Sequence, residues 1–248
     1  MTFDTVPLTE WVGAEIKGLD LGGVLEGATI AALREAWLRH HVLLFRDQDL
    51  SEAQQIRFAS YFGRATETNQ SVNKERRPDA DPRMMLVSNI RENGKLIGTL
   101  PGGELQFHSD SAFLKRPLMA TVLYSVLVTS TGGNTRFVNM HAVLDSLPTE
   151  LRGAIEGRKA LNVFDFLTQV KTGKLDRQTS VKYSHPAIRT HPETGRATLY
   201  VNRLMTEEIE GIPEAKSDAL LTRLFEITEC SPFVFQHAWR PGDLIIWD

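Results

Sequence analysis

His108 and Asp110, separated by one serine, are the side chains best suited to chemistry in this sequence of 248 residues. In an extended strand, residues two positions apart point to the same face, so we expect the imidazole and the carboxylate to lie side by side. One histidine and one carboxylate are two of the three ligands in the 2-His-1-carboxylate sites that bind ferrous iron in non-haem oxygenases. The pair alone is a weak motif, because a hydrogen-bonded surface pair can have the same spacing.

The other histidines are weaker candidates as metal ligands. His237 lies in an expected strand over 233–239 and is an alternative ligand, although a packed or hydrogen-bonded role suits a strand histidine better. His40 and His41 end an expected helix, where the helix dipole favours histidine, and we expect a capping or packing role. Structural roles at turns or strand edges are also expected for His141, His185 and His191.

The apolar pattern predicts an α+β fold that is mainly β. A capping-box sequence, Ser51 with Gln54, marks the start of one helix. Two long polar segments, 64–103 and 166–184, interrupt the pattern, and the second is either a solvated loop or a lid over a pocket. The expected helices are 29–40, 51–62, 146–157 and 217–228, the last with Ser217 as its N-cap. The expected strands are 12–21, 41–48, 119–128, 135–138, 187–190, 197–202, 233–239 and 244–247.

Many short strands with a few helices outside them indicate one domain over 1–248. Its expected architecture is a double-stranded β-helix, or jelly roll, with flanking helices. The sequence stops at Asp248, directly after the apolar strand 244–247, in the middle of a sheet pattern. We therefore expect the C-terminal part of this fold to be missing from the sequence.

Composition narrows the choice of partners and compartment. The formal net charge is -3 and no long run of Lys and Arg occurs, so nucleic acid is not an expected partner. The N-terminus has no basic flank or apolar core, and no apolar stretch is long enough for a bilayer, so we expect a cytoplasmic protein without membrane association. The single cysteine, Cys230, excludes a disulfide within the chain and is expected to be buried at a helix end.

Segments spread along the chain resemble the TauD/TfdA, or taurine dioxygenase-like, family of Fe(II)- and 2-oxoglutarate-dependent dioxygenases. The stretch from Gln106 to Phe113, followed by Pro117, resembles the metal-binding segment of that family. Four further segments match in the expected order, and the resemblance covers nearly the whole chain. These segments are Arg46-Asp47-Gln48, the turn from Ser130 to Thr135, the hairpin from His185 to Asn202, and the segment from Trp239 to Asp248.

The resemblance assigns roles to three residues. It makes His108 and Asp110 the first two iron ligands, and it implies that the Thr135 hydroxyl contacts 2-oxoglutarate. The third ligand, a histidine, is expected about six residues beyond Asp248, and an arginine that pairs with the 2-oxoglutarate carboxylate follows further on. Fe(II) and 2-oxoglutarate are thus the implied cofactor and co-substrate, and a homo-oligomer, dimer or tetramer, is typical of the family.

The implied reaction is hydroxylation of an unactivated C–H bond in a small organic substrate, with O2 consumed and succinate and CO2 as co-products. We expect the substrate to be an anion other than taurine. Glu104 replaces an asparagine of taurine-type members, and the loop 66–71 lacks their histidine and tyrosine; an acidic Glu104 either marks a cationic group on the substrate or is solvated. Two alternatives stay open: a non-catalytic jelly-roll binding protein with a degenerate metal site, and a cupin-like metal enzyme that uses His237.

Overall fold

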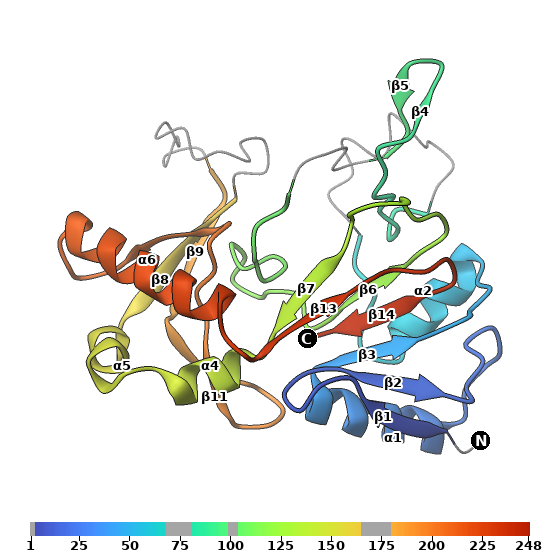
Figure 1. Cartoon of the computed structure of the whole chain (residues 1–248), viewed down its shortest axis with the longest axis horizontal. Coiled ribbons are helices and arrows are strands. Elements are labelled where there is room, and N and C mark those ends of the chain that lie inside the picture. Colours follow the sequence, from blue (N-terminus) through green and yellow to red (C-terminus); the bar gives the residue numbers. More distant parts are fainter. Residues whose placement is uncertain (1–2, 68–80, 99–103, 165–179) are drawn as a thin grey trace.

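A five-stranded sheet forms the centre of the computed structural model, which describes residues 3–67, 81–98, 104–164 and 180–248 (Figure 1). Its strand order is β1-β2-β3-β14-β6, with β2 and β3 parallel and all other neighbours antiparallel. The late strand β14 thus lies between two much earlier ones. The strands are β1 Asp4–Pro7, β2 Ala14–Lys17, β3 Val42–Phe45, β6 Thr121–Tyr124 and β14 Leu244–Trp247.

Smaller sheets complete the β structure. A three-stranded sheet has the order β12-β8-β9, and three further antiparallel pairs join β13 with β7, β10 with β11 and β4 with β5. The β4–β5 hairpin projects away from the central sheet, at the top of Figure 1. The additional strands are β4 Arg91–Glu92, β5 Lys95–Leu96, β7 Thr135–Val138, β8 Lys159–Val163, β9 Lys182–Pro186, β10 Ile188–Thr190, β11 Ala197–Leu199, β12 Thr206–Ile209 and β13 Val234–His237.

Helices cover the outside of the sheets. The capping box at Ser51 is confirmed, since its side chain accepts from the Gln54 backbone while the Gln54 side chain accepts from the Ser51 backbone. The first helix ends at His41, which caps it in the left-handed conformation with φ 66°. The described helices are α1 Gly27–His40, α2 Glu52–Ser60, α4 Met140–Ser146, α5 Thr149–Ile155 and α6 Glu214–Glu229.

Both faces of the central sheet are buried. On β3, Leu43 and Phe45 face α1 and α2, while Val42 and Leu44 face the β7–β13 pair and contact Phe137 and its neighbours. Alternate residues of a strand point to opposite faces, so this division follows directly from the strand VLLF. A third apolar cluster joins α4, α5 and α6 to β8, β11 and β12. Two packed β layers with helices outside agree with the jelly-roll architecture expected from the sequence.

Several local expectations are wrong. Ser217 does not cap α6, which begins earlier after Pro213, and its hydroxyl accepts from the Ile209 backbone instead. Cys230 is exposed, because the end of α6 faces solvent. The helix predicted over 146–157 is present as the shorter α5, whereas the preceding α4, which ends at Ser146, was not predicted.

Polar sequence also concealed strands. The polar segment 64–103 contains the hairpin of β4 and β5, and strand β9 begins near the end of the polar segment 166–184. Residues 166–179, where a lid was one alternative, lie outside the described residues. The strands β8 and β12 were not predicted at all, because β8 buries the polar Asn162, whose side chain bonds Thr206 of β12. Among the described residues, no helix is long and apolar enough to cross a bilayer.

Candidate metal centre

The structure brings the two predicted ligands together: His108 Nε2 lies 3.3 Å from Asp110 Oδ1. The strand that was expected to bring these two side chains together is absent, since residues 104–110 form no strand. A turn begins at Ser109, whose carbonyl accepts from the Ala112 backbone, and Ser111 adopts φ 59°. The reversal of the chain, rather than the pleat of a strand, places the imidazole beside the carboxylate.

The His108 ring is oriented by the backbone. Its Nδ1 lies 2.9 Å from the Gln106 carbonyl oxygen, which can only accept, so Nδ1 carries a proton and Nε2 faces Asp110. A lone pair on Nε2 and a carboxylate oxygen 3.3 Å away repel each other unless a cation joins them. That cation is either a second proton on the ring or a bound metal ion.

The electrostatics of the pair are consistent with this need for a cation. Burial alone lowers the pKa of His108, but the hydrogen bond to Asp110 and its negative charge outweigh burial and raise that pKa. Burial alone raises the pKa of Asp110, yet His108 and the Thr121 hydroxyl together lower it. Both groups therefore favour their charged forms, and a divalent ion can replace the ring proton between them.

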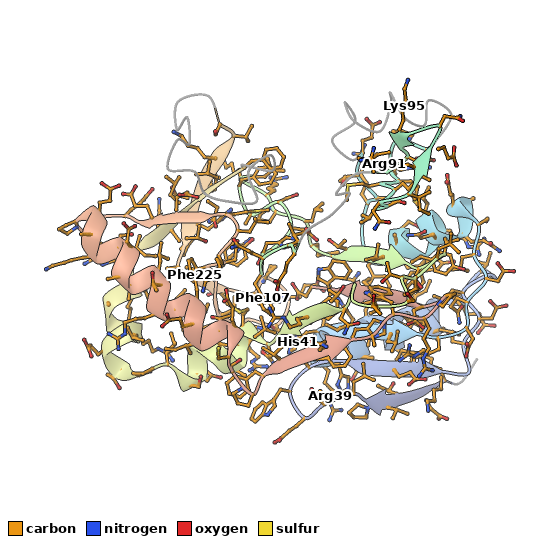
Figure 2. The ribbon with its side chains drawn as sticks, turned by 45° about the horizontal axis from the view of Figure 1, so that its top comes forward. Arg39, His41, Arg91, Lys95, Phe107 and Phe225 are labelled. Carbon is orange, nitrogen blue, oxygen red and sulfur yellow. The ribbon has the colours of Figure 1, made fainter. Side chains whose placement is uncertain are left out.

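Thr135, the predicted 2-oxoglutarate contact, is the first residue of β7, and its side chain accepts a hydrogen bond. The Trp239 indole Nε1 donates to Thr135 Oγ1 at 2.9 Å, so the hydroxyl keeps its own proton to donate to an anion. The next residue, Arg136, places its guanidinium 4.9 Å from the Phe107 ring centroid. This contact joins the strand of Thr135 to the segment of His108, and Phe107 lies near the centre of Figure 2. The role of Thr135 itself stays a prediction.

His237 has the packed, hydrogen-bonded role that the sequence favoured. Its Nε2 lies 2.9 Å from Asp243 Oδ2, and both side chains are almost fully buried. The same oxygen accepts from Arg46 at 2.7 Å and from the Arg240 backbone. Because its Nε2 faces a carboxylate already shared with Arg46, His237 is poorly placed to hold an exchangeable metal. No group of three or more His, Cys, Asp and Glu within the described ranges could hold a metal ion.

The remaining histidines bond to the chain itself. His185 lies 2.9 Å from the Leu114 carbonyl, and His191 Nε2 lies 2.6 Å from Asp248 Oδ2. His141 Nδ1 lies 2.6 Å from the Ala197 carbonyl, but it sits inside α4 and not at a turn as expected. Their partners support the structural roles predicted for all three.

Glu104 forms an ion pair that the sequence did not predict. Its Oε1 lies 3.4 Å from Arg136 Nη2; the Glu104 side chain is largely in solvent and that of Arg136 is partly covered. The negative charge of Glu104 is partly compensated there, which weakens the idea that it recognises a cationic substrate. Thr121 and Trp239 also escaped prediction as supports of the site, because they lie 11 and 104 residues from the groups they contact.

A histidine and a carboxylate that converge in this way are two of the three ligands in the 2-His-1-carboxylate sites of non-haem iron oxygenases. The family model described as "Taurine catabolism dioxygenase TauD, TfdA family" matches residues 4–248. The chain therefore belongs to the TauD/TfdA family.

Similar proteins agree with this assignment. The (S)-phenoxypropionate/alpha-ketoglutarate-dioxygenase of Sphingobium herbicidovorans is 31% identical, over 99% of this chain and 86% of its own length. The alpha-ketoglutarate-dependent 2,4-dichlorophenoxyacetate dioxygenase of Cupriavidus pinatubonensis is 30% identical, over 98% and 88%. The crystal structure of a taurine dioxygenase from Burkholderia xenovorans superposes with a TM-score of 0.80 at 26% identity, covering 100% of this chain and 81% of that one.

These findings confirm the expected class of enzyme. The protein is a 2-oxoglutarate-dependent dioxygenase, an oxidoreductase that uses Fe(II) and 2-oxoglutarate and acts with O2 on a small molecule. Its mixed helix and strand structure has the jelly-roll fold of its structural neighbours. The non-catalytic alternative finds no support among these relatives.

Proposed function

We propose that the protein hydroxylates an unactivated C–H bond of a small organic anion, at a ferrous ion held by His108 and Asp110. The observation that carries this proposal is the 3.3 Å approach of His108 Nε2 to Asp110 Oδ1, in an arrangement that needs a cation. The third ligand, a histidine, and the arginine partner of 2-oxoglutarate remain predictions for positions beyond Asp248.

The donor atoms fit ferrous iron. A neutral imidazole and a carboxylate oxygen suit divalent first-row metals, and a set of three such ligands on one side of the ion leaves positions for co-substrate and O2. When bound, iron and 2-oxoglutarate supply the oxidising power: O2 gives one oxygen atom to the substrate and one to succinate, with release of CO2.

The chain's own groups prepare the site for these molecules. The Gln106 carbonyl keeps the His108 proton on Nδ1, which leaves Nε2 for the metal. Thr135, already accepting from Trp239, has a hydroxyl proton to donate to a carboxylate of 2-oxoglutarate. Placing both partners in fixed positions lowers the entropic cost of reaching the transition state.

An anionic substrate is supported by the charges near the site and by the relatives. Arg136 stacks on Phe107, the residue before His108, and its exposed pair with Glu104 at 3.4 Å is weak enough to exchange for a substrate carboxylate. The relatives from Sphingobium herbicidovorans and Cupriavidus pinatubonensis carry carboxylates in their names, phenoxypropionate and dichlorophenoxyacetate. Aryloxy acids are therefore the first substrates to test.

Succinate release with Fe(II), 2-oxoglutarate and O2 tests the proposal over aryloxy carboxylates, alkyl sulfates and small sulfonates. We expect turnover with an anion, a hydroxylated or fragmented product, and no stimulation by the matching uncharged amide. His108→Ala should abolish turnover and weaken Fe(II) binding at least 10-fold, whereas His40→Ala, at the last residue of α1, should change neither. Unchanged iron affinity in His108→Ala contradicts the metal site, and preference for the amide contradicts the anionic substrate.

A further inference from the structure

We propose that Thr121 is a positioning residue that orients the Asp110 carboxylate toward the metal and thereby sets metal affinity. This inference rests on the proposed function, in which Asp110 is a metal ligand. It adds a residue outside the His-x-Asp motif, from a strand 11 positions further along the chain.

The two oxygens of Asp110 have separate partners. Thr121 Oγ1 donates to Asp110 Oδ2 at 2.6 Å, while Asp110 Oδ1 faces His108 Nε2 at 3.3 Å. A hydroxyl-to-carboxylate bond of this length is charge-assisted and among the stronger hydrogen bonds in proteins. With Oδ2 held, the carboxyl group cannot rotate freely about χ2, and Oδ1 stays directed to the point that His108 also faces.

Thr121 is held more rigidly by the fold than Asp110, the residue to which it donates. Asp110 belongs to a turn outside any strand and precedes Ser111, whose φ of 59° is uncommon for a residue other than glycine. Thr121 begins β6 in the central sheet, where it pairs with Trp247 of β14. Its β-branched side chain has few rotamers, so the hydroxyl position follows the sheet. The sheet thus fixes a ligand that the local turn alone would leave free to rotate.

A competing explanation is that the bond only ties the turn to the sheet. In that case its loss would lower the stability of the metal-free protein and leave metal affinity unchanged. If Thr121 positions the ligand, its loss weakens metal binding, because groups that hold ligands typically contribute 10- to 100-fold in affinity.

The test is titration of the full-length, metal-free protein with Mn(II) or Fe(II) under nitrogen, with thermal unfolding measured on the same samples. Thr121→Val keeps the shape and removes the hydroxyl, and we expect its metal Kd to rise about 10-fold or more. Thr121→Ser restores the hydroxyl and should return Kd to within about threefold of wild type. Thr5→Val, an exposed threonine of β1, is the matched control and should leave Kd unchanged.

Each outcome decides one question. A Thr121→Val protein that binds metal like wild type, or a Thr121→Ser protein as weak as Thr121→Val, overturns the inference. Should Thr121→Val fail to fold, Thr121→Ala removes the same hydroxyl without added bulk, and the same comparison applies. His108→Ala is titrated alongside: if it also binds normally, the proposed metal site is wrong, whereas if it alone loses binding, only the role of Thr121 is wrong.

Discussion

Acidification should destabilise the protein through His41, the residue that caps α1. The pKa of His41 is lowered from 6.5 to about 4, chiefly by burial and also by His141, Arg196 and His191, while Asp248 opposes the shift. The His41 ring is therefore protonated below about pH 6.5 in the unfolded chain, but only below about pH 4 in the folded protein. The free energy of unfolding accordingly falls as the pH drops through this window, and is unaffected by His41 above it.

The size of the effect follows from the two pKa values. Each tenfold change in proton affinity corresponds to about 1.4 kcal/mol, so the fall from 6.5 to about 4 corresponds to roughly 3 kcal/mol in full. By pH 5 about 2 kcal/mol of this is already lost. Water that reaches the half-buried ring reduces both figures, so they are upper bounds.

Urea unfolding of wild type and His41→Asn at pH 7.5 and pH 5 measures this term. Asparagine adopts the left-handed conformation that His41 has at φ 66°, so the variant keeps the helix cap and loses only the titrating ring. Other groups titrate in both proteins and largely cancel in the difference. We expect wild type to lose more than the variant over this range, by up to about 2 kcal/mol; an equal loss in both proteins would refute the assignment.

Three other substitutions test separate contacts. Asp243→Ala removes the buried acceptor of three hydrogen bonds, and urea unfolding should show a loss of about 3–5 kcal/mol; a loss below about 1 kcal/mol would contradict the buried pairing. Trp239→Phe removes the donor to Thr135, worth about 1 kcal/mol, so the Kd of 2-oxoglutarate should rise about fivefold, and an unchanged Kd would speak against a role for this bond. Ser51→Ala breaks the capping box of α2 and should cost about 1 kcal/mol of stability; unaltered thermal unfolding would disagree.

Elements whose signals are local were predictable from the sequence. The capping box needs only residues three apart, the strand VLLF is a continuous apolar run, and the inward face of α6 repeats at helical spacing. The hairpin of β10 and β11 spans a short turn, and it was also expected. In each case the stabilising contacts lie within a few residues, so the pattern itself contains the cause.

Features that depend on distant partners were not predictable. The strand β8 looks ambiguous because Asn162 interrupts it, and only pairing with Thr206 on β12 explains a buried amide there. In the site, the closeness of His108 and Asp110 was foreseen although its cause, a turn, was not. Thr121 and Trp239 carry no local signal, since Thr121 resembles any other strand threonine and Trp239 lies just after β13 with its partner 104 residues away.

The position of β14 has a consequence for how the chain acquires its fold. Residues 244–247 are made after every other described strand, yet they lie between β3 and β6, which are made far earlier. Until β14 arrives, the edges of β3 and β6 that face it have no partner in the central sheet, and such edges promote aggregation. Closing the sheet also joins residues about 200 positions apart in sequence, which slows folding. Until synthesis has passed Trp247, these two edges are therefore points at which the nascent chain is open to aggregation.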